Sequence, residues 1–196
     1  MSREQFLYAL CLALLIVPSA AAAGPETQTC SGAANHLLER AARSGDVDAQ
    51  HYLGTKLFQE GCSAAERNRG LEILHALAEQ GHGPTLFDLG QMLLQTARTP
   101  QEEALATDIV RRSAEAGHPE AEALLGLLMI SDATDATDRE MGVYWLGSAA
   151  DKGFPDAAMA LSTLYARGRN GVVMDRCAAS LWEEAALLIA DPDLES

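Results

Sequence analysis

The sequence has few aromatic residues, few basic residues, and no long apolar run after its N-terminus. Phe, Tyr and Trp make up 5% of the 196 residues. No later stretch is apolar enough to span a bilayer, which excludes membrane insertion beyond the first residues. Asp and Glu outnumber Lys and Arg by 28 to 14, and the formal net charge is −14. Such a field repels phosphate backbones, so no nucleic acid partner is expected, whereas basic or mixed-charge protein surfaces are compatible with it. Solubility alone is the simpler explanation of the charge.

Catalytic and metal-binding motifs are missing as well. The sequence contains no Gly-x-Ser-x-Gly elbow, Ser-x-x-Lys pair, His-Glu-x-x-His helix or Walker-type loop. Its five histidines show no close metal-ligand spacing. The Asp-rich stretch 131–138 lacks the glycine turn and terminal glutamate of an EF-hand, and we expect a solvated capping loop there. The sequence thus predicts no catalytic residue, no cofactor and no metal site.

Residues 1–23 have the features of a signal peptide. An apolar run over 6–17 is followed by Pro18 and by an alanine tract that ends at Ala23, where we expect cleavage. Arg3 is offset by Glu4, which leaves an uncleaved membrane anchor as the alternative. Cleavage would leave an N-terminal segment over 24–36 and a periplasmic or secreted protein without membrane insertion.

The most informative feature of the chain is a repeat of 36 residues. Glycine returns at that interval at Gly45, Gly81, Gly117 and Gly153, each time in an Ala-x-x-Gly frame. A leucine follows eight positions after each of these glycines, and in the first three copies it precedes another glycine. A period of this length in helix-forming residues predicts stacked helical hairpins.

Each hairpin consists of a first helix, the A helix, and a second, the B helix. A helices are expected from near Asp46, Pro84, Pro119 and Pro155, with Val47, Ala49, Tyr52, Leu53 and Leu57 on the apolar face of the first. B helices are expected over 37–44, 71–80, 104–116, 141–152 and 178–189, and A-to-B loops over 60–68, 97–102, 131–139 and 168–176. Gly54, Gly90 and Gly126 inside the A helices predict close approach of the facing B helices. The array spans 37–190, before an acidic tail over 191–196.

The motifs themselves resemble a known repeat. Ala-x-x-Gly-His-Pro-Glu-Ala at 114–121, Ala-x-x-Gly-Phe-Pro-Asp-Ala at 150–157, and Leu-Gly at 89–90 and 125–126 are similar to Sel1-like repeats, relatives of tetratricopeptide repeats. The resemblance covers roughly 37–188. It implies an all-α fold, a right-handed superhelical solenoid of antiparallel helix pairs with A helices on the concave face. Exported bacterial members of this family include cysteine-rich proteins and periplasmic regulators.

Tetratricopeptide geometry, carried onto this chain, also implies a partner-binding stripe. It places His51 and Phe58 on the concave face in the first unit, Phe87, Gln91 and Gln95 in the second, and Met159 in the fourth. Thr55, Gln59, Leu94, Leu127, Ile130 and Thr163 follow the same stripe. Packing between successive A helices is the alternative, and we expect it for Leu94, Leu127 and Ile130. Exposed apolar groups among amides suit an extended peptide or a partner helix.

Three cysteines remain after the predicted cleavage. Cys30 lies 15 residues before Gly45 and Cys62 lies 17 after it, so antiparallel helices would bring them to the same end. We therefore predict a Cys30–Cys62 disulfide, worth about 3–4 kcal/mol in the chain-entropy model. Cys177 is expected to be buried as a small apolar residue, with intermolecular pairing as the alternative.

The sequence as a whole predicts a noncatalytic, exported scaffold that binds a protein or peptide in the cell envelope, as a regulator or assembly factor. Two alternatives remain open. One is an envelope hydrolase of β-lactam or peptidoglycan-like substrates, although no serine nucleophile with a base is recognisable. The other is a purely structural spacer.

Overall fold

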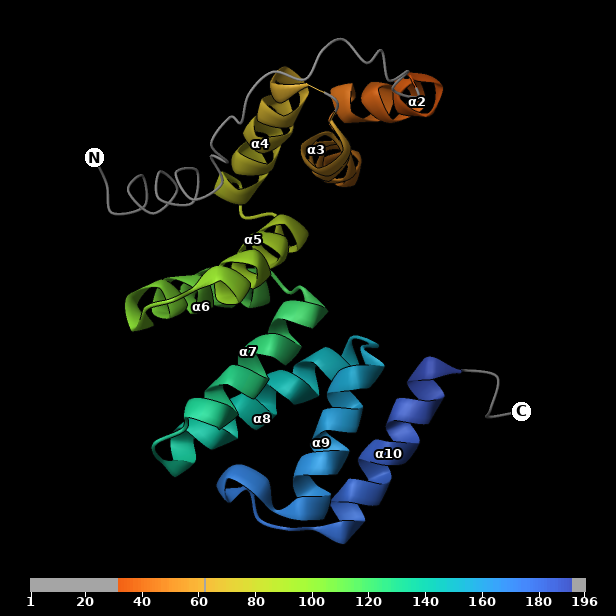
Figure 1. The fold of residues 1–196 in the computed structure, drawn as a ribbon. Coiled ribbons are helices and arrows are strands. Elements are labelled where there is room, and N and C mark those ends of the chain that lie inside the picture. The colour runs from red at the N-terminus through yellow and green to blue at the C-terminus, as the bar shows by residue number, and fades with distance from the viewer. Residues whose placement is uncertain (1–31, 62, 192–196) are drawn as a thin grey trace. The chain divides into compact units, whose positions relative to one another are not determined.

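The computed structural model describes residues 32–61 and 63–191, and the regular structure within these ranges is helical, without strands (Figure 1). The predicted all-α array of helix pairs is therefore confirmed. The chain divides into two compact units, residues 1–85 and 86–196, which are described separately below. The predicted signal peptide, the cysteines Cys30 and Cys62, and most of the acidic tail lie outside the described residues.

The first unit contains α2 (Gly32–Arg43), α3 (Val47–Glu60) and α4 (Ala64–Glu79). Helices α3 and α4 form an antiparallel pair, and α2 packs against α3. Their core is small: Ala42, Leu53 and Leu57 are buried, with Leu38 and Ile73 packed against them. The predicted first helix, expected from residue 37, thus begins five residues earlier, at Gly32.

The second unit contains three helix pairs. They are α5 (Gly83–Thr96, which begins at the boundary) with α6 (Pro100–Glu115), α7 (Pro119–Asp132) with α8 (Ala136–Asp151), and α9 (Pro155–Arg167) with α10 (Arg176–Ala190). A short 3-10 helix, η1 (Arg169–Gly171), lies between α9 and α10. One apolar cluster joins Val110 of α6 to Leu125 of α7. A second cluster joins Leu146 of α8 to Leu161 of α9 and Ala186 of α10.

Every turn from a B helix to the next A helix has the same backbone geometry. The four periodic glycines have φ of 93°, 79°, 87° and 87°. Residues that carry a Cβ atom rarely adopt such positive φ values, whereas glycine adopts them readily. At Gly117 the amide donates to Ala114 O over 2.8 Å, and the next amide, of His118, donates to Ser113 O over 3.2 Å. This pair of bonds is the Schellman arrangement, and it recurs at the other three glycines. The repeat period therefore follows from a helix stop that needs glycine.

The B helices that follow an A helix begin earlier than the sequence predicts, so the A-to-B loops are shorter. Capping boxes start two of them: Ser63 with Glu66 at α4, and Thr99 with Glu102 at α6. Asp135 caps α8 by accepting from the Asp138 amide over 3.0 Å, which confirms a capping loop in this stretch. The first turns of these helices are mostly exposed and carry no large apolar side chain, so they lack the apolar periodicity on which the boundaries were predicted.

The glycines within the A helices lie where two helices approach closely, as predicted. A Cβ atom built on Gly90 would lie 2.7 Å from Val110 Cγ2. One built on Gly126 would lie 2.7 Å from the carbonyl oxygen of Gly142 and 2.9 Å from Leu146 Cγ. The A and B helices of a pair therefore touch with almost no side chain between them at these points.

Burial was predicted wrongly at Val47, Tyr52 and Cys177. Tyr52 and Val47, expected on the apolar face of the first A helix, are 60% and 39% exposed. Cys177 is exposed at the start of α10 and is a free thiol. The cause at Cys177 is its place in the first turn, where its amide donates to the capping carboxylate of Asp175 over 2.9 Å.

Candidate partner-binding surface

Equivalent positions on the three A helices of the second unit expose a mixed strip of side chains. We call it the A-helix surface; it comprises Gln91, Gln95, Leu127, Met159 and Thr163. Gln91, Leu127 and Thr163 are separated by 36 residues, so they occupy the same place in α5, α7 and α9. Gln95 and Met159 lie one turn away from a member of this row, on the same side of their helices. Leu127 is 45% and Met159 44% exposed, so the strip has two accessible apolar side chains among polar ones.

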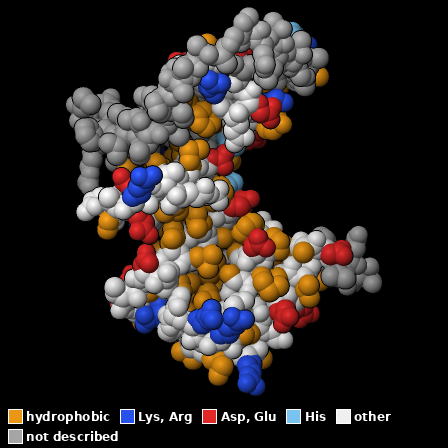
Figure 2. Space-filling model, in the orientation of Figure 1, with side chains coloured by type: hydrophobic (Ala, Val, Ile, Leu, Met, Phe, Trp, Pro, Cys, Tyr) orange, Lys and Arg blue, Asp and Glu red, His pale blue; other side chains and the backbone are white. Residues whose placement is uncertain are grey.

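Shared apolar clusters hold these helices together beneath the surface. Leu94 of α5 packs against the cluster of Val110 and Leu125, and Ala123 of α7 belongs to the cluster of α9 and α10. Figure 2 shows hydrophobic side chains gathered over α7, α8 and α9 on one face of this unit. The A-helix surface is therefore presented by packed helices rather than by loops, which limits the conformational entropy lost on binding.

Phe87 is only partly exposed and has a structural role. Its side chain is half-buried and packs against the cluster of Val110 and Leu125. The ring centroid lies 5.2 Å from that of His118, tilted by 55°. His118 is the residue before α7, and its Nε2 lies 3.2 Å from Glu120 Oε2. Phe87 thus contacts the residue that precedes α7, the next A helix.

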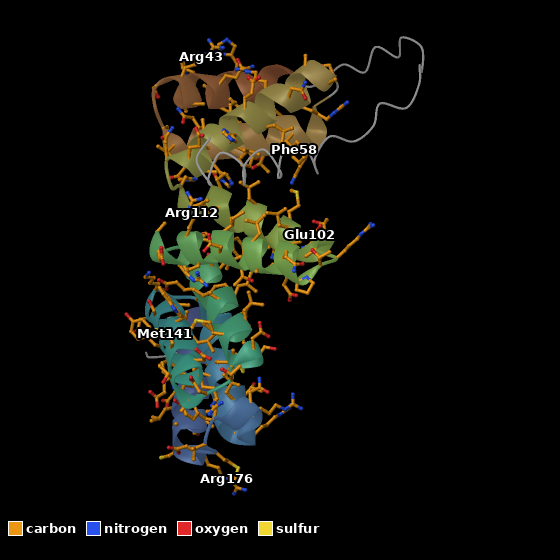
Figure 3. All side chains as sticks on the ribbon, turned by 90° about the vertical axis from the view of Figure 1, so that its left-hand side faces the viewer. Arg43, Phe58, Glu102, Arg112, Met141 and Arg176 are labelled. Carbon is orange, nitrogen blue, oxygen red and sulfur yellow. The ribbon has the colours of Figure 1, made fainter. Side chains whose placement is uncertain are left out.

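In the first unit His51 and Phe58 are half-buried. The His51 ring lies 5.4 Å from that of His82, which in turn places Nδ1 2.9 Å from Thr85 Oγ1. Because 51 and 87, and 82 and 118, are repeat-equivalent positions, this ring pair is the counterpart of Phe87 and His118. Phe58 lies near the C-terminal end of α3 (Figure 3).

The predicted alternative was packing between A helices, and two of the three residues expected there are buried against neighbouring helices. Ile130 is 2% exposed within a cluster, and Leu94 is partly buried against another. The expectation for Leu127 is wrong, because its helix turns this side chain outward beside the equivalents of Gln91 and Thr163. Tyr52 and Val47 of α3 are also exposed, although the sequence placed them on an apolar face.

A partly buried ion pair, which the sequence did not predict, lies at the start of α7. The Glu122 side chain is 3% exposed, and its Oε1 lies 2.5 Å from Lys152 Nζ. The same ammonium donates to the carbonyl of Gly117 over 3.2 Å, while Glu122 Oε2 is buried without a hydrogen-bond partner. Leu86 and Ala158 are buried at the equivalent positions, so only one copy of the repeat places a charge here.

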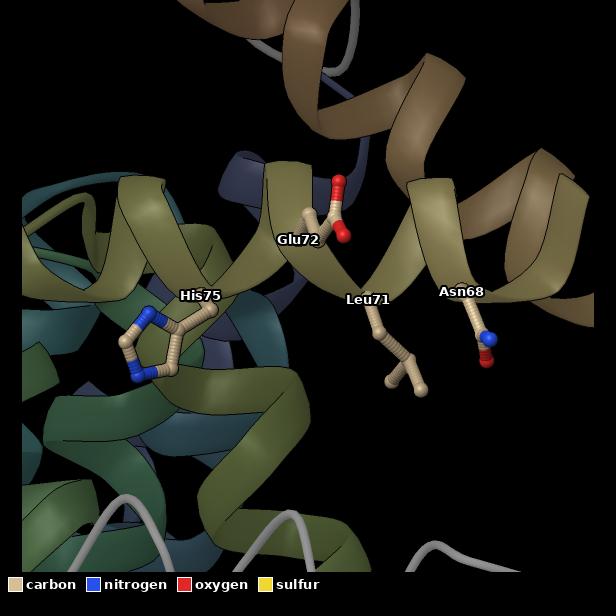
Figure 4. A pocket seen from close by; sticks show the side chains of 4 residues that line it. All are labelled: Asn68, Leu71, Glu72 and His75. Atoms are coloured by element: carbon tan, nitrogen blue, oxygen red, sulfur yellow. The ribbon is translucent and has the colours of Figure 1, made fainter. Parts of the chain in front are cut away.

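A pocket of about 320 Å³ lies along α4 in the first unit (Figure 4). Asn68, Leu71, Glu72 and His75 line it, at the spacing of one helix face. His75 Nδ1 lies 3.9 Å from Glu79 Oε2, and Glu72 is exposed. Among residues 32–61 and 63–191, no three acidic, histidine or cysteine side chains are placed to hold a metal ion.

Comparison with known proteins identifies similar folds. No family model and no curated protein sequence matches the chain. A protective antigen with an SLR fold, from uropathogenic Escherichia coli strains, matches 76% of the chain with 28% identity and a TM-score of 0.59. A Sel1 repeat protein from Oxalobacter formigenes matches 79% with 26% identity and a TM-score of 0.59. The chain spans 32% of the length of the first and 61% of the second. These matches confirm the resemblance predicted from the motifs.

An immunity protein from Pseudomonas aeruginosa is similar over 98% of the chain, with 20% identity and a TM-score of 0.56. At that identity the likeness concerns the fold alone. Within the described part of the chain, no helix has the length and apolar character needed to cross a bilayer.

Proposed function

Because the chain is a Sel1-like repeat protein, we propose that it is a noncatalytic scaffold whose A-helix surface binds a protein or peptide partner. The observation that carries this proposal is the exposure of Leu127 and Met159 beside Gln91, Gln95 and Thr163 on packed helices. Apolar side chains give such a surface affinity, because burial removes their area from water. The amides and the hydroxyl select a partner that can satisfy them with hydrogen bonds.

We further propose that this binding takes place in the cell envelope, with the protein periplasmic or secreted and acting as a regulator or assembly factor. The apolar run over 6–17 and the alanines before residue 24 support export. The similar antigen of uropathogenic Escherichia coli is consistent with such a location. In the same proposal Cys30 and Cys62 form a disulfide, since oxidising compartments favour such bonds.

Site-specific cross-linking in intact cells tests the binding surface. A photoreactive residue is placed at Leu127 or at Gln91, and at Tyr144 as a control, since Tyr144 is 64% exposed on the B helix α8. We expect mass spectrometry to identify one protein from both A-helix positions and not from Tyr144. Recovery of no specific protein, or of the same proteins from all three positions, would contradict the proposal.

Substitution then tests the energetic role of the surface in the partner that cross-linking identifies. Leu127→Asp and Met159→Asp place charges at exposed positions, so we expect affinity for that partner to fall about tenfold or more with little change in melting temperature. Phe87→Asp is a weaker test, because the Phe87 ring also packs against an apolar cluster. Turnover of a β-lactam or peptidoglycan fragment by the purified protein would instead support the hydrolase alternative.

A further inference from the structure

Four arginines gather around the loop that joins α9 to α10. Arg167 ends α9, Arg169 begins η1 and Arg176 begins α10. Arg139 of α8 lies against the same loop, with its Nε 2.9 Å from a Cβ built on Gly171. We call this set, together with Val173 and Met174, the basic loop surface. In a chain with a formal net charge of −14, these residues form a local concentration of positive charge. Figure 3 shows Arg176 at this end of the unit.

These arginines are not engaged in ion pairs within the described chain. None of the four forms an ion pair with any described residue, whereas Arg111 and Lys152 of the same unit are paired with Asp108 and Glu122. The single carboxylate within the loop, that of Asp175, accepts from the amides of Cys177 and Ala178 at the start of α10. Four arginines and this aspartate leave a formal charge of +3 on the surface.

The loop that carries the arginines has a defined backbone. Its two ends are joined by the Asp175 amide, which donates to Tyr165 O over 2.9 Å. Gly168 and Gly171 have φ of 60° and 77°, and Asn170, at 53°, is the sole non-glycine residue with positive φ in the described ranges. Asparagine tolerates this conformation better than most residues. A loop held in this way loses little conformational entropy when a ligand binds.

Two exposed apolar side chains accompany the charge. Val173 is 82% and Met174 57% exposed, the former more than any other large hydrophobic residue of the described chain. Figure 2 shows Lys and Arg side chains beside hydrophobic ones at this end of the unit. A ligand that matches this surface must therefore supply negative charge and an apolar group within a short distance.

We propose that the basic loop surface binds an acidic segment of a protein partner that also carries an aliphatic or aromatic side chain. Carboxylates would pair with the arginines, since guanidinium groups bind them with bidentate geometry, and the apolar side chain would cover Val173 and Met174. An anionic membrane is the less suitable ligand, because the rest of this acidic chain would be repelled by it. The surface adjoins the A-helix surface, since Arg167 lies one turn beyond Thr163, but the inference does not depend on that surface.

A binding experiment with a designed peptide tests this proposal. The probe is a fluorescent 12-residue peptide of Glu interspersed with Leu and Phe, and its anisotropy is measured with the full chain in about 0.1 M salt. We expect saturable binding that weakens at about 1 M salt, where the screening length falls from about 10 to about 3 Å. The triple variant Arg167→Glu, Arg169→Glu, Arg176→Glu should bind at least about tenfold more weakly.

A charge-matched control separates local from global electrostatics. Arg43→Glu, Arg98→Glu and Arg111→Glu change the net charge equally at exposed positions outside the surface, and should leave affinity within about twofold. Val173→Ser with Met174→Ser should weaken binding while its salt dependence is retained. The proposal is overturned if the wild-type protein does not bind the peptide, or if both triple variants lose affinity equally. Arginine-dependent binding to phosphatidylserine vesicles without peptide binding would also overturn it, in favour of a lipid ligand.

Discussion

Replacement of Gly126 by alanine gives a direct measure of how closely α7 and α8 approach. Two effects oppose each other. Alanine is favoured over glycine inside a helix by about 1 kcal/mol, because glycine loses more backbone entropy on folding. Against this, the new Cβ would lie 2.7 Å from the carbonyl oxygen of Gly142 and 3.1 Å from the amide nitrogen of Leu146. Both are backbone atoms, so the contact cannot be relieved by a side-chain rotation.

The steric effect should therefore be the larger of the two. Overpacking of a close contact costs about 1–3 kcal/mol, and more when backbone must shift, so we expect Gly126→Ala to destabilise the protein by about 1–2 kcal/mol net. For a chain of this length that lowers the melting temperature by about 2–8 °C, at about 2–4 °C for each kcal/mol. Circular dichroism at 222 nm during heating measures the change.

Gly147 provides the matched control in the partner helix. It lies inside α8, and a Cβ built on it would have no neighbour within 4 Å. Gly147→Ala should therefore show the propensity gain alone and raise the melting temperature by about 2–4 °C. If Gly126→Ala raises the melting temperature as much as Gly147→Ala does, the close approach of the two helices is refuted.

Three further substitutions test other parts of the fold by the same melting assay. Thr99→Ala removes the capping box that Thr99 forms with Glu102 and should cost about 1 kcal/mol; no loss would show that the cap is not formed in solution. Lys152→Met leaves the buried carboxylate of Glu122 without its cation and should cost about 2–3 kcal/mol, and the added change Glu122→Leu should restore most of this. Asn170→Val should cost about 1–2 kcal/mol because of its positive φ, whereas Asn170→Gly should be nearly neutral.

The parts of the fold that could be predicted from sequence are those at which a particular residue type meets a specific backbone requirement. Gly117 stops a helix in a conformation that other residues avoid, and Pro119 begins the next helix without needing an amide hydrogen. Each such signal occurs in several copies in register, so turns and helix pairing could be predicted. The starts of α4 and α6 could not be predicted from apolar periodicity, because their first turns are exposed and stabilised by capping side chains.

The candidate surface was predictable only in part, because exposure depends on the angle at which neighbouring helices meet. Apolar character alone suggested that Leu127 packs between A helices, and the structure places it outside. Comparison of equivalent positions would have found it, since Thr55, Gln91 and Thr163 stand there in the other copies. This position is exposed in the three copies of the second unit, at Gln91, Leu127 and Thr163, and half-exposed at Thr55. An apolar residue at a position that is polar in the other copies is therefore a candidate contact.

The same comparison explains why the ion pair of Glu122 and Lys152 was missed. Equivalent positions of Glu122 are buried and apolar in two other copies, so helical periodicity predicts a core residue and not a charge. Its partner is 30 residues away at the end of α8, and only the folded pair brings their charges within 2.5 Å. We expect the pair to favour the observed register, because a register that separates Glu122 from Lys152 would leave a buried carboxylate without its cation. Because neighbouring repeats have similar sequences, their helices could also pair in other registers. A buried charge that finds its partner in one register only would favour that register over the others.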